Sequence, residues 1–256
     1  MRVNISLAAW PGLRHAEAAA IAIGMSRAGV LAEPGLGPIA CEHVQLVPQS
    51  FGVLTEELAA ELRDRYPDGN LRLHANVRVL ERHRFADLSG FALHTEWFAQ
   101  AARISRMLGA TAYTAHAGRR NEATLAEVFD NTRRCAELFG VPVGVEGHYP
   151  TPGNEFNLAT WEEYRALLDS GVAYALDLSH LNIVAHRTGK LDTGLTAELL
   201  ASENAIEIHL SGNDGRGDQH RIVEAPCWWH ALLENRNPAA IIFTEGNHRR
   251  AEASTH

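Results

Sequence analysis

Short apolar runs rich in β-branched residues alternate along the chain with longer segments that have a helical period. This alternation is typical of repeated strand–helix units around a parallel sheet. There are eight such runs, which is the number of strands in a closed parallel barrel. They are Val3–Leu7, Val44–Val47, Leu71–Val77, Ala110–Ala115, Val141–Val145, Val172–Leu176, Ala205–Leu210 and Ala240–Thr244. The pattern therefore predicts an α/β fold, a single (β/α)8 TIM barrel, with one domain over residues 1–256.

The helical segments carry start and stop signals. Thr124 with Glu127, and Thr160 with Glu163, have the spacing at which a hydroxyl and a carboxylate satisfy the free amides of a helix start. Glycines at the opposite ends favour left-handed caps before the next strand, and these are Gly109, Gly140 and Gly171. The segment from 28 to 41 is rich in glycine and proline and has no clear period, so we expect an irregular loop there.

Composition narrows the classes of protein that the barrel can belong to. The chain has 31 acidic and 23 basic residues, a formal charge of −8 and a single lysine, which argues against a nucleic-acid partner. No apolar run approaches the roughly 20 residues of a membrane helix, and no signal-peptide pattern opens the sequence, so we expect a cytoplasmic protein without a membrane partner. The three cysteines are far apart, which offers neither a disulfide framework nor a thiolate zinc site.

Histidine is over-represented, with 14 residues, and it gathers with acidic residues where the predicted strands end. In a parallel barrel these carboxyl ends meet at one mouth. Nine side chains of metal-ligand type lie in the strands from the third to the eighth or in the segments that follow them, namely His74, His116, Glu146, Asp177, His180, His209, Asp218, His220 and Glu245. Nine ligands exceed the four to six that one ion takes, so we expect two or three ions, with Glu146 as a bridge.

Three further residues are candidate substrate contacts. Arg14 lies in the loop after the first strand and could grip a carboxylate. His148 follows Glu146 at the mouth, although a solvated loop explains it as well. Asn213 lies between two predicted ligands, in a glycine-rich stretch that equally suggests a turn. No GxGxxG or Walker loop is present, so nucleotide binding has no support.

The ordered ligand set resembles two branches of the xylose-isomerase-like TIM-barrel superfamily. In endonuclease-IV-like enzymes, nine ligands in this order hold three zinc ions, and all nine residues match. The segments LDLSHLNIVAHRTGKLD, EIHLSGN and GDQHRIVEAPCWWHALL resemble instead the multinuclear non-haem iron-dependent oxidative enzymes related to the methanobactin-biosynthesis oxidase. The resemblance covers the C-terminal half well, whereas the first seventy residues match only at Gly12–Arg14.

The oxidative branch implies an enzyme that uses two or three iron ions (Fe²⁺/Fe³⁺) and dioxygen to modify a cysteine of a small ribosomal peptide. Glu146, Asp177 and His209 would then be catalytic, and a separate partner protein would recruit the peptide. The implied grouping is His74, His116 and Glu146 on one ion, Glu146, Asp177, His209 and Glu245 on a second, and His180, Asp218 and His220 on a third. A thiolate is a strong iron ligand, so binding the substrate sulfur would fix the reacting atom.

Two alternatives stay open at this stage, because iron, zinc and manganese accept the same imidazole and carboxylate ligands. The first is a trinuclear Zn²⁺ phosphodiesterase of the endonuclease-IV type, for which an arginine cluster at residues 119, 120, 133 and 134 could offset the acidic charge locally. The second is a sugar isomerase or epimerase with Mn²⁺ or Mg²⁺. It would use Glu146 and Glu245 as a pair and leave several ligands without a role.

Overall fold

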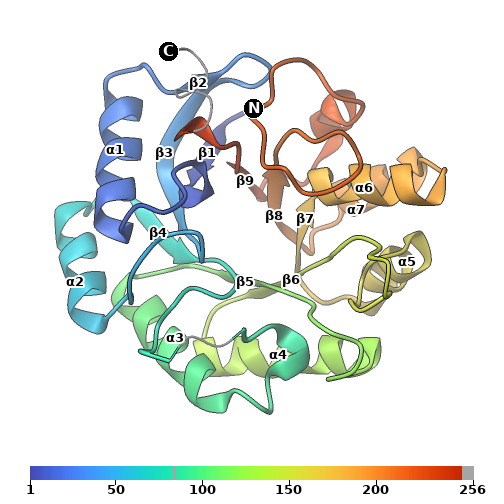
Figure 1. Cartoon of the computed structure of the whole chain (residues 1–256), viewed down its shortest axis with the longest axis horizontal. Coiled ribbons are helices and arrows are strands. Elements are labelled where there is room, and N and C mark those ends of the chain that lie inside the picture. The colour runs from blue at the N-terminus through green and yellow to red at the C-terminus, as the bar shows by residue number, and fades with distance from the viewer. Residues whose placement is uncertain (83–84, 250–256) are drawn as a thin grey trace.

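Eight parallel strands form a closed barrel with helices outside it, in a computed structural model that describes residues 1–82 and 85–249 (Figure 1). The strands are β1 (Val3–Ser6), β3 (Gly37–Leu46), β4 (Asn70–Leu73), β5 (Tyr113–His116), β6 (Val143–Glu146), β7 (Tyr174–Asp177), β8 (Ala205–Leu210) and β9 (Ile241–Thr244). β1 pairs with both β3 and β9, and a parallel bridge between His74 and Thr114 joins β4 to β5. Each of the eight predicted runs overlaps a barrel strand, so the predicted fold is confirmed. Residues 83–84 and 250–256 of the predicted domain lie outside the described residues.

The helices follow the strands around the barrel. They are α1 (His15–Arg27), α2 (Glu56–Arg65), α3 (Thr95–Met107), α4 (Leu125–Phe139), α5 (Trp161–Ser170), α6 (Leu178–Thr188) and α7 (Thr193–Ala201), with short 3-10 turns η1 (Leu7–Ala9), η2 (Leu88–Gly90) and η3 (His230–Asn235). Thr124 and Glu127 form the complete reciprocal capping box at α4. Thr160 caps α5, but the Glu163 carboxylate accepts from the Ala159 amide instead of the Thr160 amide. The three predicted cap glycines all have positive φ.

The expectation of an irregular loop over residues 28–41 is wrong. Ala32–Glu33 forms a short strand, β2, which pairs antiparallel with the start of β3. The glycines and prolines that interrupt the apolar period make the tight turn of this hairpin, where Gly37 has φ +79° and the Leu36 amide donates to the Glu33 carbonyl at 3.0 Å. The hairpin also carries Glu33 into the interior, where it is 1% exposed.

The core lies between the barrel wall and the inner faces of the helices. On α3, the apolar positions that recur at three- and four-residue steps, among them Trp97, Phe98, Ala101 and Ile104, are all buried. Their burial removes apolar surface from water and fixes the helix against the strands. In the part of the chain that the structure describes, no helix has both the length and the apolar character to cross a membrane.

Candidate metal centre

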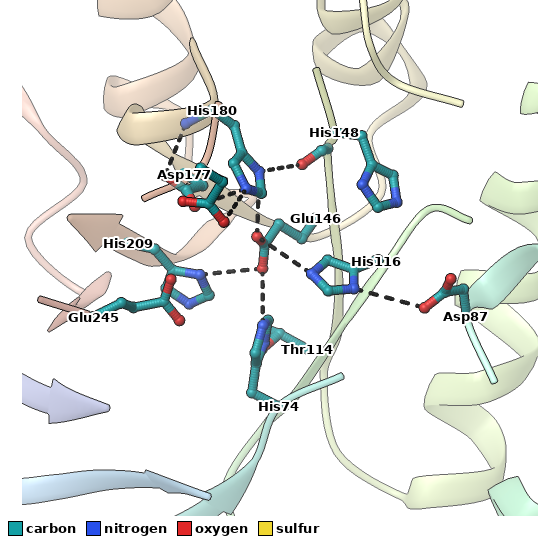
Figure 2. A network of polar contacts seen from close by, with 12 residues as sticks. His74, Asp87, Thr114, His116, Glu146, His148, Asp177, His180, His209 and Glu245 are labelled. Atoms are coloured by element: carbon teal, nitrogen blue, oxygen red, sulfur yellow. Dashed lines mark hydrogen bonds and ion pairs between the residues drawn. The ribbon is translucent and has the colours of Figure 1, made fainter. Parts of the chain in front are cut away.

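The nine predicted ligands all lie at the carboxyl ends of the strands, around one point. His116, Glu146 and Asp177 are the last residues of β5, β6 and β7, whereas His209 lies inside β8. His74 and Glu245 directly follow β4 and β9, His180 lies in the first turn of α6, and Asp218 and His220 lie in the loop after β8. Figure 2 shows the imidazoles of His74, His116, His180 and His209, which come from different strands and from α6, turned towards the Glu146 carboxylate.

Glu146 is the centre of the cluster. Its Oε2 atom lies 3.1 Å from Nδ1 of His209 and 3.3 Å from Nε2 of His74. Its Oε1 atom lies 3.5 Å from Nδ1 of His180 and 3.8 Å from Nε2 of His116. A carboxylate with imidazoles on both oxygens has the arrangement expected of a ligand shared between ions.

The remaining ligands continue from this centre through Asp177 and His180. Asp177 caps α6, since its Oδ1 accepts from the amides of Ser179 at 2.7 Å and His180 at 3.1 Å. This cap turns the chain directly into the helix, and it places Nε2 of His180 3.3 Å from Asp177 Oδ2. The same nitrogen lies 3.5 Å from Asp218 Oδ2, which in turn lies 2.8 Å from Nε2 of His220. His220 Nδ1 lies 3.7 Å from Glu245 Oε2, so the chain of ligands ends on the last strand.

Among residues 1–82 and 85–249, three groups of ligand atoms are compact enough to hold an ion, with all atoms of a group within 4.8 Å of one another. They are His74, His116 and Glu146; His74, His209 and Glu245; and Glu146, Asp177 and His209. The first coincides with one of the ion groupings that the sequence resemblance implies, and the third is part of another. Two of the groups share Glu146, as a bridging ligand requires.

Buried polar atoms that lack hydrogen-bond partners are evidence that cations bind at this site. Glu146 Oε2, His209 Nδ1 and His220 Nδ1 are buried side-chain atoms that have no hydrogen-bond partner within the described part of the chain. Buried polar atoms are otherwise almost always bonded, because leaving one unsatisfied costs about 1–3 kcal/mol. Their lone pairs face other ligands across 3.1 to 3.7 Å, which is the position of a shared cation. The residues present therefore fit a cluster of metal ions.

The electrostatics show that the cluster needs positive charge. Burial alone would lower the pKa of His220, yet its bond to Asp218 and the charge of Glu245 raise the pKa to about 9. Burial likewise opposes the charged form of His180, but Asp177 and Asp218 hold its pKa well above the ordinary value. Burial raises the pKa of Glu245 to about 7. Protons on these groups offset the buried carboxylates, and a bound cation would displace them.

A second layer of polar residues lies beneath the ligands, inside the barrel. Glu207 is fully buried on β8 and forms an ion pair with Arg72 at 2.7 Å. Burial by itself would raise the pKa of Glu207, but the Arg72 guanidinium and the bond to His209 lower it to about 2. Gln45 and Thr114 also donate to Glu207, each at 3.0 Å. On the other side of the centre, Asp87 lies 3.6 Å from Nδ1 of His116 (Figure 2).

This layer was not predicted from the sequence, because Arg72, Thr114 and Glu207 lie inside the strands and not at their ends. In β8, Glu207 and His209 alternate with the isoleucines, so the period of two already places both on the same face. Arg72 and His74 stand in the same relation at the end of β4. A charged residue at a strand position that faces the barrel interior could therefore have indicated this polar layer. Asp87 lies in a long loop after β4, and no pattern in the sequence marked it.

The three predicted substrate contacts have different surroundings in the structure. His148 stacks on Phe156 with ring centroids 4.4 Å apart and lies beside His116 at 5.0 Å (Figure 2). Asn213 is engaged by the protein itself, since its amide donates to the Ser179 carbonyl at 2.8 Å. Arg14 is exposed just before α1, and its backbone pairs with Phe51. A substrate role for all three stays a prediction.

A cavity of about 250 Å³ opens beside the ligands, and it is lined by His116, His148, Tyr149, Phe156, His180 and Asp218. A narrower space of about 80 Å³ reaches the ligands themselves, with Pro48 and Gln49 on one wall. The two spaces share His116, His180 and Asp218, so the larger cavity leads to the metal position. Its walls are aromatic and imidazole rings with one carboxylate.

Among the described residues, the arginine cluster of the sequence is engaged by partners within the protein. Arg119 pairs with Glu155 at 3.0 Å, and Arg120 donates to Glu163 at 2.9 Å. Arg133 pairs with Asp130 at 2.8 Å, and Arg134 lies over the ring of Phe91, 5.3 Å from its centroid. The charges that would have gripped a nucleic-acid backbone are thus largely offset.

No protein-family model and no curated protein matches the sequence. Solved structures match it over nearly their whole length. One is a D-tagatose 3-epimerase-like protein, 18% identical, with a TM-score of 0.60 over 100% of this chain and 94% of that chain. Another is an AP endonuclease of family 2 from Brucella melitensis, 14% identical, with a TM-score of 0.63 over 99% and 98%. A third is the IolI protein with a bound zinc atom, 10% identical, with a TM-score of 0.60 over 96% and 88%. The chain therefore has the xylose-isomerase-like TIM-barrel fold.

Proposed function

We propose that the protein is a multinuclear metal-dependent enzyme that hydrolyses a small phosphate ester. The observation that carries the proposal is the convergence of nine imidazole and carboxylate ligands on the single carboxylate of Glu146. One ion uses four to six ligands, so a set of this size is suited to two or three ions. Bound divalent ions supply Lewis acidity, which lowers the pKa of a coordinated water and offsets charge on phosphate oxygens.

One set of residues would hold the metal ions, and another set would enclose the substrate. Glu146, Asp177 and His209 hold the centre, and none is more than 2% exposed, so bulk water is excluded from that side. His148, Tyr149 and Phe156 line the adjoining cavity, where they would enclose the organic part of the substrate. A cavity of about 250 Å³ favours a small molecule over a polymer.

Charge supports a small substrate as well. The net charge is −8, and Arg119 and Arg120, which lie shortly after His116 in sequence, are paired with carboxylates. A protein that binds a nucleic-acid backbone needs several cationic contacts to phosphate. The proposal therefore keeps the phosphoester chemistry of the zinc alternative and replaces its nucleic-acid substrate with a small ester.

The fold neighbours include sugar epimerases, and four of the ligands, Glu146, Asp177, His209 and Glu245, would suffice for one ion. Two observations weigh against this chemistry. An acid–base pair of glutamates needs free oxygens, whereas Glu146 has imidazoles against both of its oxygens. The reaction would also leave the imidazoles of His74, His116, His180 and His220 unexplained.

Oxidation of a cysteine-containing peptide by an iron cluster is the second candidate. The observation that favours it is the set of sequence blocks around the site, which form β7 with α6, the end of β8 and the loop that carries Asp218 and His220. The ligand types suit iron as well as zinc. The fold neighbours reported above are named as epimerases, an endonuclease and a zinc-bound protein, so they lend it no support.

The first experiment measures metals in protein purified without chelators and without oxygen, and then assays the loaded protein. Two or three zinc ions per chain and zinc-dependent hydrolysis of bis-(p-nitrophenyl) phosphate would support the proposal. Two or three irons, with oxygen consumed when a cysteine-containing peptide is added, would replace it with the second candidate. A single manganese with conversion of a ketose to its epimer would favour the epimerase, and a chain that binds no ion would overturn all three.

Asp177→Asn and Asp192→Asn form a matched pair for this experiment. Both aspartates cap a helix, because Asp177 accepts amides at the start of α6 and Asp192 accepts the Leu195 amide at the start of α7. Asp192 pairs with Lys190 and belongs to none of the ligand groups. Loss of metal and activity in the first variant alone would therefore report on the site and not on helix capping.

A further inference from the structure

We propose that Glu207 is a positioning residue that decides which ring nitrogen each of two histidines presents to the metal centre: Nδ1 for His209 and Nε2 for His74. The inference rests on the metal centre but not on the reaction that the centre catalyses. Glu207 touches neither the ion positions nor the substrate cavity. It acts through hydrogen bonds on the side of the imidazoles that faces away from the ions.

Glu207 accepts hydrogen bonds from four side chains in a fully buried place. Arg72 donates to its Oε1 at 2.7 Å, and Gln45 and Thr114 donate to its Oε2 at 3.0 Å each. The fourth partner is Nε2 of His209, 3.1 Å from the same Oε2. An ionised carboxylate only accepts hydrogen bonds, so every one of these partners must bring a proton.

These contacts determine which nitrogen of the His209 ring carries the proton. Because Nε2 must carry the proton that it donates to Glu207, a neutral ring has its lone pair on Nδ1. Nδ1 is the atom without a hydrogen-bond partner, 3.1 Å from Oε2 of Glu146. Gln45 Nε2 also lies 3.1 Å from His209 Nε2, and both of these nitrogens direct their protons to Glu207.

For His74 the influence of Glu207 passes through Thr114. The single hydroxyl proton of Thr114 is donated to Glu207, so the hydroxyl oxygen can only accept from the ring of His74. The contact is 2.9 Å long and involves Nδ1. The lone pair of His74 is therefore on Nε2, which lies 3.3 Å from the same Glu146 oxygen. One carboxylate thus fixes two imidazoles through opposite nitrogens.

Removing the hydroxyl relay separates this role from general stability. Thr114→Val releases His74 while leaving Glu207, Arg72 and His209 in place. Thr132→Val is the matched control, because Thr132 is also a buried threonine but donates to the Val128 carbonyl within α4. Glu207→Gln is the stronger variant, since its amide nitrogen donates where either Arg72 or the pair of His209 and Thr114 needs an acceptor.

The test uses zinc-loaded protein with ¹⁵N-labelled histidine, in which nuclear magnetic resonance identifies the metal-bound nitrogen of each ring. We expect Nε2 for His74 and Nδ1 for His209 in the parent chain. Thr114→Val should weaken zinc binding by about tenfold and disturb His74 alone, whereas Glu207→Gln should weaken it by about 100-fold and disturb both rings. Thr132→Val should match the parent chain.

Several results would overturn the inference. Zinc bound through the other nitrogen of either ring would do so, as would unchanged ring signals and affinity in Thr114→Val. If Glu207→Gln does not fold, Thr114→Val and its control still decide the matter. A parent chain that binds no metal ion removes the metal centre and this inference together, whereas a zinc-loaded chain that does not hydrolyse phosphate esters refutes only the proposed function.

Discussion

Acidification should destabilise this protein through His15, a residue outside the metal centre. His15 is the first residue of α1 and is 1% exposed. Burial lowers its pKa from 6.5 to about 4, since the charged ring would lose its hydration. The folded protein therefore keeps this ring neutral at pH values where an unfolded chain would protonate it.

The size of the effect follows from the two pKa values. Between about pH 6.5 and pH 4 the unfolded chain binds a proton at His15 that the folded chain does not bind. Stability therefore falls as the pH decreases through this window and is fully present above it. From pH 7.5 to pH 5 the loss amounts to about 2 kcal/mol, at about 1.4 kcal/mol per pH unit once the unfolded ring is protonated.

Urea unfolding of the parent chain and of His15→Gln, both free of metal, measures this loss. Other groups titrate in the same range, so the informative quantity is the difference in unfolding free energy between the two proteins at each pH. That difference should shift by about 2 kcal/mol in favour of the variant between pH 7.5 and pH 5. A difference that stays constant across this range would show that His15 is not held neutral, whatever the variant's absolute stability.

Three further predictions concern the metal centre and the residues that support it. Zinc affinity should rise from pH 6 to pH 9 and binding should release protons, because His220 without metal has a pKa of about 9. Calorimetry in two buffers of different ionisation enthalpy measures the released protons, and a zinc affinity that does not depend on pH would contradict this expectation. Glu146→Gln should bind fewer ions than the parent chain while keeping its circular dichroism spectrum, and full metal content would argue against a bridging role. Glu33→Gln should lower the unfolding free energy by about 2 kcal/mol in urea, because the carboxylate accepts from the Val223 amide, the Thr244 hydroxyl and His248; an unchanged midpoint would contradict this.

The sequence predicted the barrel and the convergence of the nine candidate ligands for the same physical reason. Buried parallel strands need apolar runs, and the residues that end these runs meet at one mouth, so ligands far apart in sequence could be grouped without coordinates. The contact of Glu146 with four imidazoles follows from that geometry. The hairpin of β2 escaped prediction because two residues of strand beside a turn leave no measurable period.

The choice of metal and reaction escaped prediction for a different reason. Zinc and iron accept the same imidazole and carboxylate set, and no residue in the set distinguishes them. The substrate cavity that we propose, around His148, Tyr149 and Phe156, comes from loop conformations that short-range patterns do not specify. The buried pair of Glu207 and Arg72 was within reach of a period-two analysis of the strands, but the network around it joins side chains of four strands, β3, β4, β5 and β8.

The barrel has a seam between β4 and β5. The other neighbouring barrel strands share ladders of paired residues, whereas these two meet, within the described residues, at the bridge of His74 and Thr114. His74 and His116 come from opposite sides of this seam, and both face Glu146. A cation bound by both histidines would link β4 to β5, where the barrel has the fewest paired residues. The metal would then stabilise the fold as well as the site. In metal-free protein we expect β4 and β5 to separate before the other strand pairs do.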